Sequence, residues 1–313
     1  MQLQFRYYLY VIAAAVIAAG SNVVAEIALR FYEMSPFPVA MLSNLLSGLV
    51  LLIAAWRSDI PIWHGWQRTD WLKILAVAIC IYSIAFVMRY ESINLIGSGK
   101  ATLLGRLETI FVVIMAVFFL KESLSVYHWI AGTLCLLGVL LINFDPMAWQ
   151  LSFGFGEFLA ILSPIGVAVG IIVSKPLIDR LNVQWMTGLA FLFSVLLTLP
   201  FWPIFPSSPV LSYWPYILIV FVGVGRGMAW LSFNLSLPHI GVTQASVIFL
   251  STSFFTIIFQ VLIARPFPAL KIQVPVNLWL TVFGGIFMVM GILILTYKPK
   301  LFSNRSTKKR RTG

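Results

Sequence analysis

The sequence predicts an all-α membrane protein whose ten transmembrane helices form two inverted five-helix repeats. Three observations support this fold class. The chain is 60% hydrophobic and only 10% charged, whereas a typical soluble domain is about 25% charged. Apolar runs long enough to span a bilayer, about 20 residues, occur ten times. The last five runs also repeat features of the first five.

Short polar, proline-containing or charged segments separate the apolar runs, and none of them leaves room for a soluble domain. The predicted spans are residues 8–30, 36–56, 71–91, 97–120, 125–143, 153–174, 184–204, 212–234, 240–263 and 275–297. Five spans per repeat is an odd number, so the second repeat must cross the membrane in the opposite direction to the first.

Basic residues in the loops predict the orientation. With the N-terminus inside, most of the Lys and Arg residues outside the spans fall on the inner side, as cytoplasmic loops require. The run of Lys and Arg in residues 298–313 lies on this side too. We therefore expect a multi-pass protein of the plasma membrane, the bacterial inner membrane, with both termini in the cytoplasm.

The net charge of +11 does not indicate a nucleic-acid partner, because much of the excess lies in this basic tail. Basic residues beside a span can instead contact anionic lipid head groups. We expect membrane lipid and a small-molecule solute as partners, and the sequence leaves open whether the chain forms a homo-oligomer.

The internal repeat has an offset of 144 residues. It places the segment 97–102, GSGKAT, on the segment 241–246, GVTQAS. It also places Ile110 and Phe111 on Phe254 and Phe255. The predicted units are residues 1–145, residues 146–297 and the basic cytoplasmic tail 298–313. Inverted repeats of this kind are typical of secondary transporters, whose substrate sites lie near the membrane midplane between the repeats.

Residues 88–143 resemble the EamA domain of the drug/metabolite transporter superfamily. The resemblance rests on a short connection, a Leu-Glu pair in mid-span, a Leu-x-Glu-x-Leu close and a glycine-rich span. These are Ile96-Gly97-Ser98, Leu107-Glu108, Leu120-Glu122-Leu124, and Gly132 with Gly138. The second repeat departs from the pattern, with Thr252 and Pro266 in place of the two glutamates. The resemblance implies a ten-span transporter of metabolites, amino acids, nucleosides or drugs.

Charged residues inside the predicted spans are the candidates for a binding site, because a charge in the bilayer centre is costly without a partner. Glu108 and Arg106 lie in the fourth span and Arg226 lies in the eighth. On an uninterrupted helix, Arg106 would point about 200° away from Glu108. We therefore expect Glu108 to pair with Arg226 across the two repeats, and Arg106 to need another partner.

Aromatic residues accompany these charges on two helical faces. Arg226, Trp230 and Phe233 share one face of the eighth span, and the offset matches them to Tyr82, Phe86 and Arg89 of the third. A cavity between these faces would combine aromatic walls with guanidinium groups, which bind carboxylates in a bidentate manner. The alternative is that both stripes only pack in the core.

Two further charges complete the candidate set. Lys100 begins the fourth span, and Glu26 lies in the first span on the same face as Arg30. Glu26 could pair with Arg30, reach Lys100 or take up protons. With Glu108, it is a candidate for proton coupling, since buried carboxylates can alternate between charged and neutral forms. Lys100, Arg106 and Arg226 against Glu26 and Glu108 give the set a formal charge of +1.

These residues predict a transporter of a small organic metabolite that works by alternating access. The net positive set favours a carboxylate-bearing or zwitterionic solute, such as an amino acid, and the direction could be export. An exporter of cationic or amphipathic drugs is the alternative, in which Glu108 and Glu26 would bind the cation. We expect no enzyme activity, no cofactor and no metal site, because no phosphate-binding loop, catalytic constellation or metal-ligand spacing occurs in the sequence.

Overall fold

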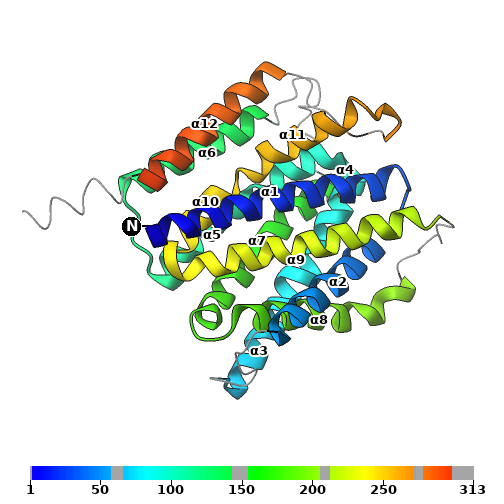
Figure 1. Ribbon diagram of the computed structural model, residues 1–313, viewed down its shortest axis with the longest axis horizontal. Helices are drawn as coiled ribbons and strands as arrows, with labels where there is room; N and C mark the ends of the chain where they lie inside the picture. The colour runs from blue at the N-terminus through cyan, green and yellow to red at the C-terminus, as the bar shows by residue number, and fades with distance from the viewer. Residues whose placement is uncertain are drawn as a thin grey trace, which may run out of the picture.

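A computed structural model describes residues 2–57, 66–142, 154–204, 212–270, 272 and 278–297. All regular elements in these ranges are helical (Figure 1). In chain order they are α1 (Gln2–Arg30), α2 (Pro36–Trp56), α3 (Arg68–Val77), the π-helix η1 (Ala78–Ala85), α4 (Phe86–Gly105), α5 (Leu107–Leu120), α6 (Val126–Ile142), α7 (Phe155–Ile178), α8 (Val183–Thr198), the 3₁₀-helix η2 (Leu199–Ile204), α9 (Trp214–Ile240), α10 (Val242–Phe249), α11 (Thr252–Ala264), the 3₁₀-helix η3 (Pro268–Leu270) and α12 (Leu278–Tyr297).

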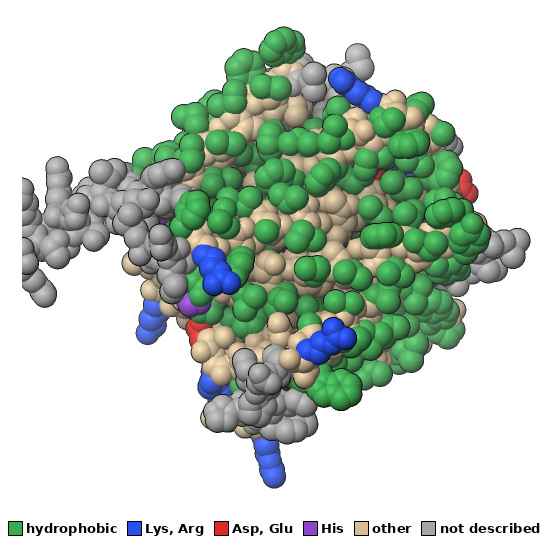
Figure 2. Space-filling model, in the orientation of Figure 1, with side chains coloured by type: hydrophobic (Ala, Val, Ile, Leu, Met, Phe, Trp, Pro, Cys, Tyr) green, Lys and Arg blue, Asp and Glu red, His purple; other side chains and the backbone are tan. Residues whose placement is uncertain are grey.

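Ten apolar helical segments of the described chain correspond to the ten predicted spans. Seven are long and apolar enough to cross a membrane, and α5, α6 and α12 contribute three shorter ones. Large hydrophobic side chains cover the face seen in Figure 2, while the Lys and Arg side chains lie mainly toward its edges. Trp56, Trp279 and Phe118, for example, are each at least three-quarters exposed. This apolar exterior is what a lipid-facing surface requires. The predicted basic tail, residues 298–313, lies outside the described residues.

The helices of the two halves pack against each other in equivalent pairs. The helix α1 packs along α9, and its counterpart α7 packs along η1 and α4. Likewise α1 contacts α11, and α7 contacts α5. The helices α2 and α8 contact each other, as do α6 and α12, which lie side by side in Figure 1. Each half therefore packs on the other through the same set of spans.

The break between the third and fourth spans does not lie where it was predicted. The sequence predicts it directly after residue 91, but α4 carries the chain through residues 92–96 without a non-helical residue. The break falls instead at Arg106, between α4 and α5. In the second half, α10 and α11 are separated at Leu250 and Ser251, and the offset of 144 places Arg106 on Leu250. Both halves therefore interrupt the equivalent span at the same position.

Glycines permit the close contact between α6 and α12. A Cβ atom added to Gly138 would lie 2.5 Å from the backbone oxygen of Gly284. A Cβ added to Gly291 would lie 2.8 Å from the backbone oxygen of Ala131. Small residues let transmembrane helices approach closely, so that dispersion forces act over a larger contact. Gly132 differs from these two, because open space surrounds its Cβ position.

Candidate functional site

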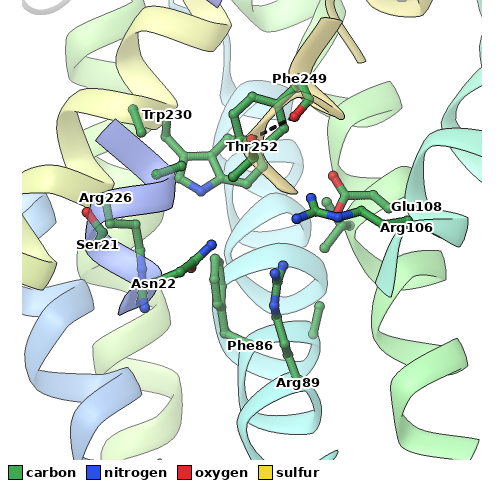
Figure 3. A pocket seen from close by; sticks show the side chains of 14 residues that line it. Ser21, Asn22, Phe86, Arg89, Arg106, Glu108, Arg226, Trp230, Phe249 and Thr252 are labelled. Atoms are coloured by element: carbon green, nitrogen blue, oxygen red, sulfur yellow. Dashed lines mark hydrogen bonds between the residues drawn. The ribbon is translucent and has the colours of Figure 1, made fainter. Parts of the chain in front are cut away.

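A cavity lies between the two halves, next to both helix interruptions (Figure 3). It draws residues from α1, η1, α4, α5, α7, α9, α10 and α11, and from the turn at Arg106. The lining residues are Ala18, Ser21, Asn22, Ala85, Phe86, Arg89, Arg106, Glu108, Val167, Arg226, Ala229, Trp230, Phe249 and Thr252. The first, third, fourth, sixth, eighth and ninth spans all contribute residues.

The interruption at Arg106 turns both of the nearby charges toward this cavity. Arg106 forms the turn before α5, and Glu108 lies in the first turn of that helix. Figure 3 shows both side chains on the same wall, with the Arg106 guanidinium directed into the cavity. The expectation that they point to different places is wrong, because it assumed a continuous helix of 3.6 residues per turn.

Two of the three nitrogens of the Arg106 guanidinium have no hydrogen-bond partner. Its Nε and Nη2 atoms are buried and form no hydrogen bond, and no ion pair joins Arg106 to another described residue. Arg89 likewise forms no side-chain hydrogen bond or ion pair within the described part of the chain, although its guanidinium points into the cavity in Figure 3. Guanidinium donors without hydrogen-bond partners are costly inside a protein, so these two groups can donate to an anionic ligand.

Arg226 has a different environment, with its guanidinium held by neutral groups. Its Nη1 atom donates hydrogen bonds to Ser43 Oγ at 2.8 Å and to Asn44 Oδ1 at 3.1 Å, and its Nη2 atom donates to the Tyr90 hydroxyl. The Cζ atom also lies 4.5 Å from the ring centroid of Phe86, a cation–π contact. Arg226 is 7% exposed. The hydrogen bonds to α2 and α4 therefore fix its position inside the protein.

The predicted pair between Glu108 and Arg226 is not formed. Both residues line the cavity, but no hydrogen bond or ion pair between described residues joins them. Figure 3 shows them on opposite walls. The cations that attract the Glu108 carboxylate are Arg89 and Arg106. Sequence position alone could not reveal this arrangement, because the partners of Arg226 come from α2 and α4.

The predicted aromatic residues occupy two layers. Phe86 and Trp230 line the cavity, while Tyr82 lies behind them and is 2% exposed. The Tyr82 ring packs edge-to-face on Trp230, with centroids 5.5 Å apart, and lies 3.9 Å from the ring of Phe191. Tyr82 therefore supports the aromatic wall and does not itself line the cavity.

Glu26, another predicted residue, is not among the described residues that line the cavity. Glu26 is buried and accepts a hydrogen bond of 2.9 Å from Gln260 Nε2. Among the ion pairs between described residues, none joins Glu26 to Arg30. Gln260 belongs to α11, so this contact links the first span to the ninth. The side chain of Lys100 lies outside the described residues.

Asn22, Phe249 and Thr252 were not predicted to belong to the site. The repeat could have identified Thr252, because it matches Glu108 and begins α11 as Glu108 begins α5. Arg89 was expected on the aromatic face of the third span as one of the guanidinium groups of the cavity, and it lines the cavity. Asn22 carried no signal of its own, since a single polar residue in an apolar helix is common at helix contacts.

Helix ends add to the positive character of the cavity. The N-termini of α5 and α11 both adjoin it through Glu108 and Thr252, and a helix N-terminus carries a partial positive charge. Half-helix N-termini at the membrane midplane bind anionic substrate groups in transporters with inverted repeats. The described residues contain no group of three His, Cys, Asp or Glu side chains that could hold a metal ion.

The cavity is small in this conformation. Its volume is about 60 Å³, whereas pockets that hold drug-sized ligands have about 300–1,000 Å³. The arrangement can therefore bind a small anion between Arg89 and Arg106, with aromatic rings nearby. A larger solute requires the two halves to separate.

The chain is similar to a family of membrane transporters and to individual members of it. The model of the EamA-like transporter family matches residues 5–144 and 154–297. The uncharacterized transporter sll1164 of Synechocystis sp. is 26% identical over 242 residues, which cover 72% of this chain and 66% of that protein, just under two thirds of its length. The uncharacterized inner membrane transporter YhbE of Escherichia coli K12 is 23% identical over 254 residues, which cover 77% of this chain and 76% of the relative.

A crystal structure of another protein shares the fold. It superimposes with a TM-score of 0.74 over 96% of this chain and 98% of its own chain, at 15% sequence identity. At this identity the match is informative about the fold alone. It includes both halves of the chain and therefore both interrupted spans.

Proposed function

Because the chain belongs to the EamA-like transporter family, we propose that it carries a small carboxylate-bearing or zwitterionic solute across the bacterial inner membrane. Amino acids are included in this class, and export is the proposed direction. The Escherichia coli relative YhbE is named as an inner membrane transporter. Both termini lie in the cytoplasm in this proposal, as the distribution of basic residues indicates.

One observation carries the choice of solute: Arg106 lines the cavity, and two buried nitrogens of its guanidinium form no hydrogen bond. A carboxylate there would form charge-assisted hydrogen bonds, which are about twice as strong as neutral ones. Phe86 and Trp230 supply apolar contact for the rest of the solute. Arg89 lies within the same cavity and supplies a second cation.

The position of the cavity supports alternating access. Residues of both halves line the cavity, and the interruption of each span lies beside it. Separation of the halves on one side of the membrane, and then on the other, would expose the same residues in turn. Glu108 and Glu26 are the proposed sites of proton coupling, since each is an acidic side chain within the membrane-spanning region.

The drug-export alternative rests on Glu108, the one acidic residue in the lining of the cavity. Arg89 and Arg106 both attract its carboxylate, so a cationic drug would have to compete with two fixed cations. This competition favours the carboxylate solute.

The test is uptake of radiolabelled amino acids and organic acids into proteoliposomes that contain the purified full chain. Uptake of at least one such solute should fall about tenfold or more in the Arg106→Gln variant, because a charged hydrogen bond is worth about 1.5–3 kcal/mol. The exposed cation Lys73 provides the control, and Lys73→Gln should retain uptake. Transport of cationic drugs alone would contradict the proposal.

A further inference from the structure

We infer that the cavity selects small organic acids that carry two negative charges. This inference rests on the proposed function and narrows its solute class. The charged residues that line the cavity are Arg89, Arg106, Arg226 and Glu108. Three cations and one ionised carboxylate leave a formal charge of +2, in place of the +1 that the sequence set implied.

The described protein does not neutralise this charge locally. The acceptors of Arg226 are a serine hydroxyl, an asparagine amide oxygen and a tyrosine hydroxyl, all neutral. They satisfy its hydrogen bonds but leave its positive charge in place. Glu108 can offset only one of the three cations. A low-dielectric site makes the remaining charge unfavourable until a ligand brings opposite charge.

The geometry provides separate partners for two carboxylates. Arg106 and Glu108 come from the interrupted fourth span, Arg89 comes from α4 and Arg226 from α9. In Figure 3 Arg89 lies between the wall that carries Arg106 and the wall that carries Arg226. Arg89 also interacts electrostatically with both of these arginines. These like charges repel one another. An anionic group between Arg89 and Arg106, and another between Arg89 and Arg226, would offset the repulsion.

The same arrangement disfavours the other charge classes. A monocarboxylate would leave one positive charge uncompensated. The ammonium group of a zwitterion would have Glu108 as its one acidic partner in the cavity lining, and the carboxylate of Glu108 is already attracted by Arg89 and Arg106. A dication would add to the repulsion. The small volume of the cavity, about 60 Å³, favours a short carbon chain.

Four compounds of equal chain length separate these classes: succinate (two negative charges), butyrate (one), 4-aminobutyrate (zwitterion) and 1,4-diaminobutane (two positive). The measurement is the thermal unfolding midpoint of the full chain in detergent with each compound, at pH 7.5 and constant ionic strength. A ligand that binds the folded state raises this midpoint by mass action. We expect succinate to give the largest rise.

Three variants connect the preference to the cavity. Arg106→Gln and Arg89→Gln should each abolish the advantage of succinate over butyrate, because each removes one cation. Arg106→Lys keeps the charge and should retain the advantage. The control Lys73→Gln removes an exposed cation that is not among the lining residues and should behave as the unmodified protein. Midpoints without ligand and size-exclusion profiles show that each variant is folded.

The outcomes distinguish this inference from the proposed function. If butyrate or 4-aminobutyrate stabilises the protein as much as succinate does, the inference is overturned and the proposed function stands. Stabilisation by 1,4-diaminobutane alone would overturn both. A succinate preference that survives in Arg106→Gln and Arg89→Gln, or no stabilisation by any of the four compounds, would also overturn the inference.

Discussion

The carboxylate of Glu122 caps a helix in the opposite half of the molecule. Its Oε1 atom accepts the backbone N–H of Val242 at 2.8 Å, and its Oε2 atom accepts that of Thr243 at 3.1 Å. These two N–H groups begin α10 and have no partner within that helix. The repeat places Pro266 where a second Glu122 would lie, so the equivalent contact cannot form in the other direction. One side chain therefore connects the close of the fourth span to the start of the ninth.

Replacement of Glu122 by alanine should lower the stability by about 1–2 kcal/mol. The change removes a helix cap, worth about 1 kcal/mol, and a negative charge at a helix N-terminus. The measurement is the unfolding midpoint in detergent. The control is Asp179→Ala, which removes an exposed carboxylate that pairs with Lys175, four residues away on the same helix end. Equal midpoints for the two variants would contradict the role of the cap.

Gly241→Ala should also destabilise the protein, by about 1–3 kcal/mol. Gly241 has φ +80° and ψ 161°, a region that only glycine adopts without strain. Its added Cβ would also lie 3.3 Å from Oε1 of Glu122, so the substitution strains the same junction. A lower unfolding midpoint is expected, whereas Gly132→Ala should leave the midpoint unchanged or raise it, because Gly132 has open space around its Cβ position. A midpoint of Gly241→Ala at or above that of the unmodified protein would refute the assigned strain.

Arg226→Ala should lower the unfolding midpoint, and Arg106→Ala should not. Removal of Arg226 leaves the buried groups of Ser43, Asn44 and Tyr90 without their donor, at a cost of about 1–3 kcal/mol. Arg106 has buried nitrogens without partners, so its removal leaves no acceptor unpaired. Thermal unfolding of both variants measures the two midpoints. A midpoint that is lower for Arg106→Ala than for Arg226→Ala would contradict this prediction.

Gly138→Ala should weaken the contact between α6 and α12. The new methyl group would lie 2.5 Å from both the Gly284 oxygen and the Met288 Cγ atom, and overpacking of this kind costs about 1–3 kcal/mol. The measurement is cross-linking between cysteines introduced on the two helices, together with the unfolding midpoint. Gly132→Ala on the same helix is the matched control. Unchanged cross-linking and an unchanged midpoint in Gly138→Ala would contradict the predicted overpacking.

Much of the fold could be predicted from the sequence because its signals are local or periodic. Apolar runs of spanning length identified the ten spans, and the offset of 144 residues identified the two halves. The same offset aligns the two helix interruptions, although neither was predicted. Gly132 and Gly138 were recognised as part of a glycine-rich span, but not that Gly138 alone of the two meets α12 closely.

The sequence by itself determined that the chain is a two-fold helical membrane protein with charges inside its spans, because the cost of exposing polar groups to lipid restricts what such segments can be. Only the tertiary structure decided how those charges are used. The break at Arg106 turns its guanidinium toward the cavity, and three residues from α2 and α4 satisfy Arg226. Such pairings depend on helix contacts between residues more than a hundred positions apart, which helical periodicity does not encode.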